Sequence, residues 1–149
     1  MTIKIVTVGA KTSESYAAAI EQYTKRMPRN TTVSWLYVKH GTGDPEASKQ
    51  QEAESILRHI NEKSRVILLD ETGKQLSSPD FSSIIFKDTR DTSIIIGGAY
   101  GVNEAVFKRA DIVWSLGLLV FPHQLVRLII AEQLYRAHTI AIGHPYHHG

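Results

Sequence analysis

Two uninterrupted apolar runs constrain the fold of this chain more than any other feature of its sequence. They are residues 66–69 (Val-Ile-Leu-Leu) and residues 94–96 (Ile-Ile-Ile). A run without alternating polar positions is typical of a strand that is covered on both faces, as in a parallel sheet. Around these runs, shorter β-rich segments alternate with stretches that have apolar residues at helical spacing. This alternation predicts an α/β fold with a mostly parallel sheet and helices on both sides.

The expected elements follow from these periodicities and from the residues that interrupt them. The expected strands cover residues 3–8, 31–39, 65–70, 93–96 and 112–116. The expected helices cover residues 13–26, 46–61, 79–88, 103–110 and 122–138. Ser78 is expected to cap the third helix, and Thr72-Gly73-Lys74 is expected to turn the chain. No repeat or clear boundary interrupts the pattern, so residues 1–149 are expected to form one domain.

Composition excludes several classes of function but selects none. The chain has 149 residues and no cysteine, which excludes disulfides, thiolate catalysis and cysteine-based zinc sites. No apolar stretch reaches the ~18 residues of a membrane span, and the start is too strand-like for a signal peptide. We therefore expect a cytoplasmic protein that does not bind a membrane. The formal net charge of +2 is too small to predict nucleic-acid binding by itself.

Three glycines follow the second apolar run and precede an expected helix. Gly97, Gly98 and Gly101 could let backbone N–H groups approach a ligand closely. Their spacing is not that of a dinucleotide fingerprint, and no Lys-Ser or Lys-Thr pair completes a P-loop. Taken alone, the segment is interpreted equally well as a bare tight turn. The adjacent carboxylates Asp70 and Glu71 are interpreted as turn and cap groups, because neighbouring strand residues point to opposite faces.

The C-terminal part of the chain combines histidine, arginine and tyrosine. His123 and Arg127 are four residues apart at the start of a helix, so they share a face where a phosphate is favoured. The alternative is a solvated helix face, and we favour the functional interpretation. Glu132 and Arg136 have ordinary ion-pair spacing, for which the structural interpretation is favoured. The wide apolar face of this last helix makes a dimer contact plausible.

The terminal segment 144–149 (His-Pro-Tyr-His-His-Gly) has three possible interpretations. Its histidines suggest a metal site, but they lack the spacing of known zinc motifs. A frayed chain end without function is the default. Alternatively, tyrosine and histidine stack on bases and donate to phosphates, which is how unpaired RNA is held. An imidazole or a phenol could also act as a base.

Several motifs, taken in order, resemble one family over nearly the whole chain. They are Val66-Ile-Leu-Leu-Asp70, Ile96-Gly-Gly-Ala-Tyr-Gly101, Trp114-Ser-Leu116, Phe121-Pro-His-Gln-Leu-Val-Arg127, Ala131-Glu-Gln-Leu-Tyr-Arg136 and His144-Pro-Tyr-His147. The chain resembles the 23S rRNA pseudouridine-N3 methyltransferases of the SPOUT superfamily. The resemblance implies a SPOUT-type α/β fold with a trefoil knot in about residues 65–149, a rarity among proteins. It also implies a homodimer that uses S-adenosylmethionine, needs no metal, and methylates rRNA on the assembled ribosome.

The resemblance also implies roles for particular residues. The implied cofactor contacts are Leu69, Gly97, Leu116, Gly117, Leu118, Leu119, Val120 and Phe121, mostly through the backbone. The implied substrate and catalytic residues are His123, Arg127, Tyr146 and His147. The base that removes the N3 proton is either His123 or the Tyr146/His147 pair. The partner's tail is expected to complete the active site.

The chain departs from the family pattern at two places. Gly117 stands where the family often has a second serine, and His148-Gly149 stands where a basic residue is common. The first change removes a possible hydroxyl contact, and the second replaces a permanent cation by one that depends on pH. Two other functions stay open: a SPOUT enzyme that acts on tRNA, and a ribosome-binding factor without catalysis. A histidine-based metal hydrolase is a more distant alternative.

Overall fold

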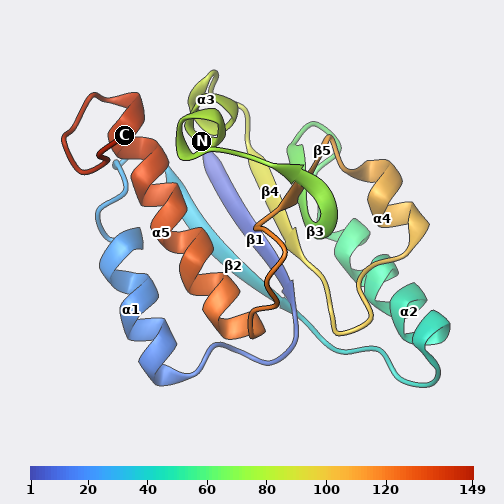
Figure 1. Cartoon of the computed structure of the whole chain (residues 1–149). Helices are drawn as coiled ribbons and strands as arrows, with labels where there is room; N and C mark the ends of the chain where they lie inside the picture. Colours follow the sequence, from blue (N-terminus) through green and yellow to red (C-terminus); the bar gives the residue numbers. More distant parts are fainter. The chain divides into compact units, whose positions relative to one another are not determined.

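A five-stranded sheet organises the fold, and its spatial order differs from the order of the strands along the chain. The strands are β1 (Thr2–Val8), β2 (Thr32–Val38), β3 (Arg65–Gln75), β4 (Thr92–Ile96) and β5 (Ile112–Ser115). The computed structural model describes all residues, Met1–Gly149, and orders the strands β2-β1-β4-β3-β5 (Figure 1). Parallel pairing joins β4 to β1 and β3, and joins β3 to β5. The predicted mostly parallel α/β fold is confirmed.

Five helices alternate with these strands. They are α1 (Glu14–Thr24), α2 (Pro45–Arg58), α3 (Ser78–Phe86), α4 (Glu104–Arg109) and α5 (His123–Ala141). Their bounds differ from the predicted ones by a few residues, which is the usual uncertainty at helix ends. Every helix and strand expected from the periodicity is therefore present.

Contacts within the chain divide it into two compact units, each built from segments that are distant in sequence. Unit 1 comprises Met1–Lys11, Val33–Gln75 and Arg90–Leu118, and it contains the sheet with α2 and α4. Unit 2 comprises Thr12–Thr32, Leu76–Thr89 and Leu119–Gly149, and it contains α1, α3 and α5. The single domain over residues 1–149 and the knot stay predictions.

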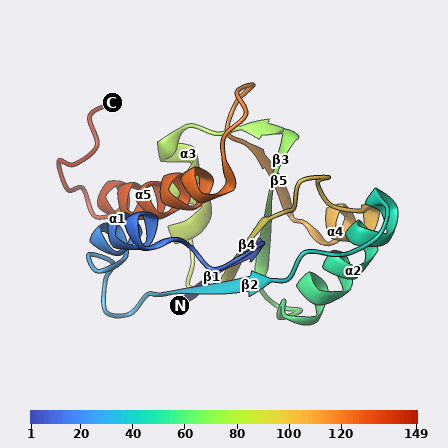
Figure 2. The ribbon, with the colours of Figure 1, turned by 90° about the horizontal axis from the view of Figure 1, so that it is seen from below.

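The core of unit 1 lies between one face of the sheet and the helices α2 and α4, which lie side by side (Figure 2). Val6, Leu68 and Ile95 of the sheet pack with Ile56 of α2 and Val106 of α4, and all five side chains are fully buried. Burial of one such side chain stabilises the fold by ~1.5–3 kcal/mol. All residues of β4 are buried, so neighbouring residues that point to opposite faces are both covered. This agrees with the interpretation of the apolar runs.

The strand β3 is longer than its sequence predicts. The turn expected at Thr72-Gly73-Lys74 is wrong, because the strand continues to its end at Gln75. The pairing with β5 shifts in register, so that Leu69 and Lys74 both align with Trp114. The intervening residues bulge out of the ladder, and pairing with a neighbouring strand keeps the chain extended afterwards.

Two local hydrogen-bond motifs surround the end of β3. The Asp70 carboxylate accepts hydrogen bonds from the backbone N–H of Thr72 (3.0 Å) and from its hydroxyl (2.5 Å), so Asp70 binds the bulged segment of the strand, and its predicted role in a turn is wrong. The helix α3 is capped by Ser77 and not by Ser78 as predicted. Ser77 Oγ accepts from the backbone N–H of Asp80 at 3.1 Å, and the Asp80 carboxylate accepts in return from the Ser77 backbone N–H. This reciprocal capping box moves the helix start by one residue.

Unit 2 is a helical unit in which α5 contacts both α1 and α3. Figure 2 shows α1 and α5 side by side. The Ser82 hydroxyl of α3 donates to the Ala137 carbonyl of α5 at 2.6 Å. The rings of Tyr23 in α1 and Tyr135 in α5 lie 6.1 Å apart. These contacts hold the last helix from two sides, so its inward residues, such as Ile130, are buried.

Candidate functional site

The point of β3 where its register shifts lies beside the carboxyl ends of β4 and β5, at one edge of the sheet in unit 1. Leu69 of β3 aligns with Ile96 at the end of β4 and with Trp114 near the end of β5. Gly97 and Leu116 follow within one or two residues of those partners. Because neighbouring strands lie ~4.8 Å apart, the three segments lie within about 10 Å across the sheet. Residues predicted from three separate motifs are thus brought to one place.

A tight turn joins β4 to α4 at this edge. The Gly101 backbone N–H donates to the Gly98 carbonyl at 3.0 Å, and Gly101 has a φ of +78° that glycine adopts without strain. A Cβ on Gly98 would lie 2.7 Å from Oε1 of Glu52, which is buried in α2. The other oxygen of this carboxylate accepts from the Gly41 N–H at 2.9 Å. Glu52 therefore fills the space beside Gly98, a position that no sequence motif indicated.

The loop after β5 presents backbone and apolar side chains. Ser115 Oγ accepts from the Gly117 backbone N–H at 3.1 Å, and Gly117 has a φ of +123° with open space where a side chain would be. Leu118, Leu119 and Val120 follow, with exposed fractions of 93%, 75% and 92%. Consecutive apolar residues in water are unfavourable unless a ligand or partner covers them. These three residues of the predicted cofactor loop are thus exposed and uncovered by the rest of the chain.

The first turns of α5 contain the predicted residues His123 and Arg127. His123 is the first residue of the helix and is half-buried. Arg127 is only 2% exposed, and its Nη1 donates to Thr12 Oγ1 at 3.0 Å. The interpretation of a solvated helix face is wrong for Arg127, because the guanidinium links α5 to the segment before α1. Periodicity alone could not show this, since a long-range partner decides the burial.

The tail of unit 2 folds back onto α5 through a cluster of polar and aromatic contacts. Glu132 Oε1 accepts from Arg136 Nη2 at 2.6 Å and from the Tyr146 hydroxyl at 3.1 Å. Arg136 Nη1 lies 3.1 Å from His147 Nδ1. The Tyr146 ring packs edge-on against Tyr135, with 4.8 Å between centroids. The default of a frayed tail is thus wrong, and Glu132 is the centre of this cluster and not merely part of a surface pair.

These contacts determine the protonation of the tail residues. Burial, followed by the hydrogen bond to Glu132, raises the pKa of Tyr146 from 10.0 to about 12. The hydrogen bond to Glu132 also raises the pKa of Arg136, which stays charged. A guanidinium has no acceptor, so His147 Nδ1 accepts the bond and Nε2 carries the ring hydrogen. In this arrangement His147 presents a donor at Nε2, whereas the one hydroxyl hydrogen of Tyr146 is already donated to Glu132.

Other classes of site find no support in the side chains. The structure has no group of three or more His, Cys, Asp or Glu residues that could hold a metal ion. No helix has the length and apolar character that crossing a membrane requires.

The sequence is similar to known proteins over its full length. A family model described as "Predicted SPOUT methyltransferase" matches residues 1–147. The ribosomal RNA large subunit methyltransferase H of Gloeobacter violaceus is 38% identical, and the alignment covers 100% of both chains. The protein of the same name from Geobacter metallireducens is 40% identical and covers 99% of both chains.

Solved structures share the fold at much lower sequence identity. A probable methylase family protein from Haemophilus influenzae aligns with a TM-score of 0.61 and 12% identity over 99% of this chain and 70% of that one. The SpoU methyltransferase AviRb from Streptomyces viridochromogenes aligns with a TM-score of 0.50 and 13% identity over 96% of this chain and 61% of that one. With the sequence match over residues 1–147, the protein belongs to the SPOUT methyltransferase family.

Proposed function

We propose that this protein transfers a methyl group from S-adenosylmethionine to N3 of a pseudouridine in 23S rRNA on the assembled ribosome. The observation that carries the proposal is the convergence of Leu69, Gly97 and Leu116 at one sheet edge. Its support in sequence is that full-length relatives are named ribosomal RNA large subunit methyltransferase H. The nucleotide and the methyl donor come from the motif resemblance.

The residues at this edge fit an adenosine-bearing donor. The open space at Gly101 and Gly117, where a side chain would meet nothing within 4 Å, lets a ligand approach the chain. The exposed side chain of Leu118, which follows Gly117 in the same unit, offers an apolar cover for an aromatic ring. When bound, S-adenosylmethionine supplies an electrophilic methyl group.

Removal of the N3 proton needs a base, and the contacts of the tail favour His123. The pKa of Tyr146, at about 12, keeps its phenol protonated near neutral pH. His147 uses Nδ1 to accept from Arg136, so its free nitrogen is a donor in the neutral ring. We assign proton removal to His123, because an imidazole is the side chain that most often acts as a general base. His147 donates to the substrate through Nε2, whereas the Tyr146 hydroxyl donates to Glu132.

Arg127 and the tail contribute to positioning. Because Arg127 is buried and bonded to Thr12, we assign it to holding the start of α5 and not to gripping phosphate. The functional unit is a homodimer in the cytoplasm, and the partner's tail completes each active site. The knot within residues 65–149 belongs to the same proposal.

Mass spectrometry of 23S rRNA from cells with and without this protein tests the proposed reaction. The expected result is one methylated pseudouridine that disappears with the protein. Calorimetry with S-adenosylmethionine should show binding by the folded protein, whereas no binding would favour a non-catalytic ribosome-binding factor. Methyl incorporation into bulk tRNA but not into ribosomes would contradict the choice of substrate. Equal turnover on an isolated stem-loop would contradict the need for the ribosome.

A further inference from the structure

A groove lies at the amino-terminal edge of the sheet in unit 1, at the ends of the strands where β1, β3 and β4 begin. It has a volume of about 430 Å³ and is lined by Lys4 of β1 and by residues 58–63, which connect α2 to β3. Arg58, His59 and Lys63 in this segment are exposed. The groove is distinct from the proposed donor site, because the two lie at opposite ends of the same parallel strands.

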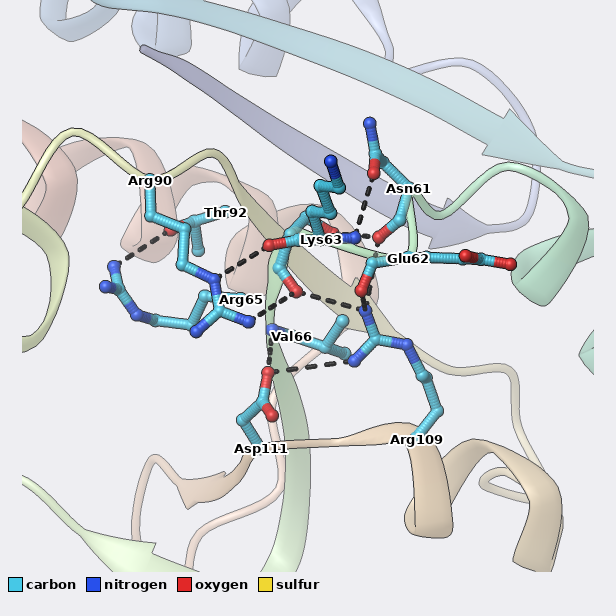
Figure 3. Close-up of polar contacts among 10 residues, drawn as sticks. Asn61, Glu62, Lys63, Arg65, Val66, Arg90, Thr92, Arg109 and Asp111 are labelled. Carbon is cyan, nitrogen blue, oxygen red and sulfur yellow. Dashed lines mark hydrogen bonds and ion pairs between the residues drawn. The ribbon is translucent and has the colours of Figure 1, made fainter.

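Two arginines hold the α2–β3 connection in place through its carbonyl groups (Figure 3). Arg90 donates to the Lys63 carbonyl at 2.8 Å and to the Ser64 carbonyl at 3.3 Å. Arg109 Nη2 donates to three carbonyls of residues 61–64 at 3.0–3.2 Å. Lys4 Nζ likewise donates to the His59 carbonyl at 2.9 Å. A carbonyl oxygen has no formal charge, so these hydrogen bonds order the loop without themselves neutralising the cations.

The remaining charges on this edge leave it positive. Arg58 and Lys63 have no ion-pair partner, and Glu62 is the one acidic residue in the lining of the groove. Asp91 and Asp111 lie nearby, but each accepts a backbone N–H, and Asp111 is also 3.7 Å from Arg109. The cations Lys4, Arg58 and Lys63 are therefore not neutralised by carboxylates.

The C-terminus of α2 would ordinarily oppose an anion here, because a helix carries partial negative charge at that end. Lys4 covers the carbonyl of His59, the residue that caps this helix. The His59 ring adds a further polar group, with Nδ1 bonded to the Ser55 carbonyl at 2.7 Å, so that Nδ1 carries a hydrogen. The cations over the C-terminus of α2 offset its partial negative charge, so that an anion can bind near this helix end.

We propose that this groove binds the phosphodiester backbone of the RNA substrate, away from the nucleotide that is methylated. The inference rests on the proposed function, which supplies the RNA. The strand β4 runs between the two ends of the sheet over four residue steps, or about 13 Å at ~3.3 Å per residue. RNA has a phosphate at every nucleotide, so a substrate engaged at the donor edge can extend over this length. Because the positive charge is concentrated in the groove, a chain of small net charge can still bind RNA.

The test is a double variant, Arg58→Gln with Lys63→Gln, compared with a control of equal net charge, Lys25→Gln with Lys108→Gln. The control lysines are exposed and each is paired with a glutamate of its own helix. Binding is measured against protein-free 23S rRNA and against large ribosomal subunits over a series of salt concentrations. Thermal unfolding and calorimetry with S-adenosylmethionine are measured on the same proteins. A charge-retaining variant, Arg58→Lys with Lys63→Arg, provides a rescue.

The groove variant should bind RNA roughly 10- to 30-fold more weakly at 0.1 M salt, and the slope of log K against log salt should fall by about 1.4–1.8. Donor binding and unfolding should be unchanged, and the rescue variant should bind normally. Equal affinities of groove variant and control would overturn the proposal. Weakened binding to ribosomal subunits but not to protein-free rRNA would also overturn it, because it would indicate an acidic protein partner. Absence of methylation by the wild type, with this RNA-binding difference intact, would count against the proposed reaction alone.

Discussion

The tail of unit 2 is held to α5 mainly by the side chain of Tyr146, and removing this side chain should release it. The phenol hydroxyl donates to Glu132, the ring packs on Tyr135, and the Arg136 guanidinium lies 4.9 Å from the ring centroid. Tyr146→Phe removes the hydroxyl and retains both ring contacts. Tyr146→Ala removes all three interactions. The two variants therefore separate the hydrogen bond from the aromatic packing.

The sizes of these contacts set the expected opening of the tail. A half-buried hydrogen bond to a carboxylate contributes about 1–1.5 kcal/mol. The aromatic pair adds about 0.5–1.5 kcal/mol, and the cation–π contact about 0.5–1 kcal/mol. A free-energy change of ~1.4 kcal/mol corresponds to a tenfold change in an equilibrium constant. Loss of the hydrogen bond in Tyr146→Phe should therefore raise the population of the open tail by roughly five- to tenfold. Tyr146→Ala should raise it by roughly 30- to 700-fold on the same scale.

Hydrogen–deuterium exchange of residues 143–149, followed by mass spectrometry, measures this population directly. His148→Ala is the matched control, because His148 is an exposed tail residue outside the cluster. Exchange should increase in the order wild type, Phe variant, Ala variant, while the peptides of unit 1 stay unchanged. Equal exchange in wild type and Tyr146→Ala would refute the reasoning, since the tail would then be held by something other than this ring.

Three further predictions concern stability, pH and catalysis. Gly73→Ala should destabilise the fold by about 1–3 kcal/mol in urea unfolding, because a Cβ there would lie 2.5 Å from the Val113 backbone; an unchanged midpoint would contradict this. Because folding raises the pKa of Tyr146 from 10.0 to about 12, its stabilisation should be complete below pH 10 and lost as pH rises toward 12. In Glu132→Gln, the free energy of unfolding, measured as a function of pH, should fall less between pH 10 and pH 12 than in the wild type. His123→Ala should lower kcat by about 10²- to 10⁴-fold and Tyr146→Phe by less than about tenfold, whereas the reverse order would identify the phenol as the base.

Local sequence pattern determined much of the fold because burial leaves a trace in the spacing of apolar residues. The runs at residues 66–69 and 94–96 lie in strands covered on both faces. The meeting of the predicted cofactor residues at one sheet edge could also be predicted from the sequence. Parallel strands bring their carboxyl ends together, and the motifs follow the predicted ends of the strands. Local sequence pattern gave a wrong prediction where the conformation of a segment depends on a partner distant in sequence. Pairing with β5 keeps β3 extended across Thr72-Gly73-Lys74, a segment whose composition favours a turn.

For the candidate site too, the sequence determined some features and the tertiary structure determined others. The sequence by itself determined which residue types are present near the C-terminus and that His123 begins a helix. Only the tertiary structure decided that Arg127 is buried on Thr12 and that Glu132 joins Arg136 to Tyr146. Residue spacing describes neighbours on one helix or strand. Burial, hydrogen-bond partners and the protonation that follows depend on segments that meet only when the chain has folded.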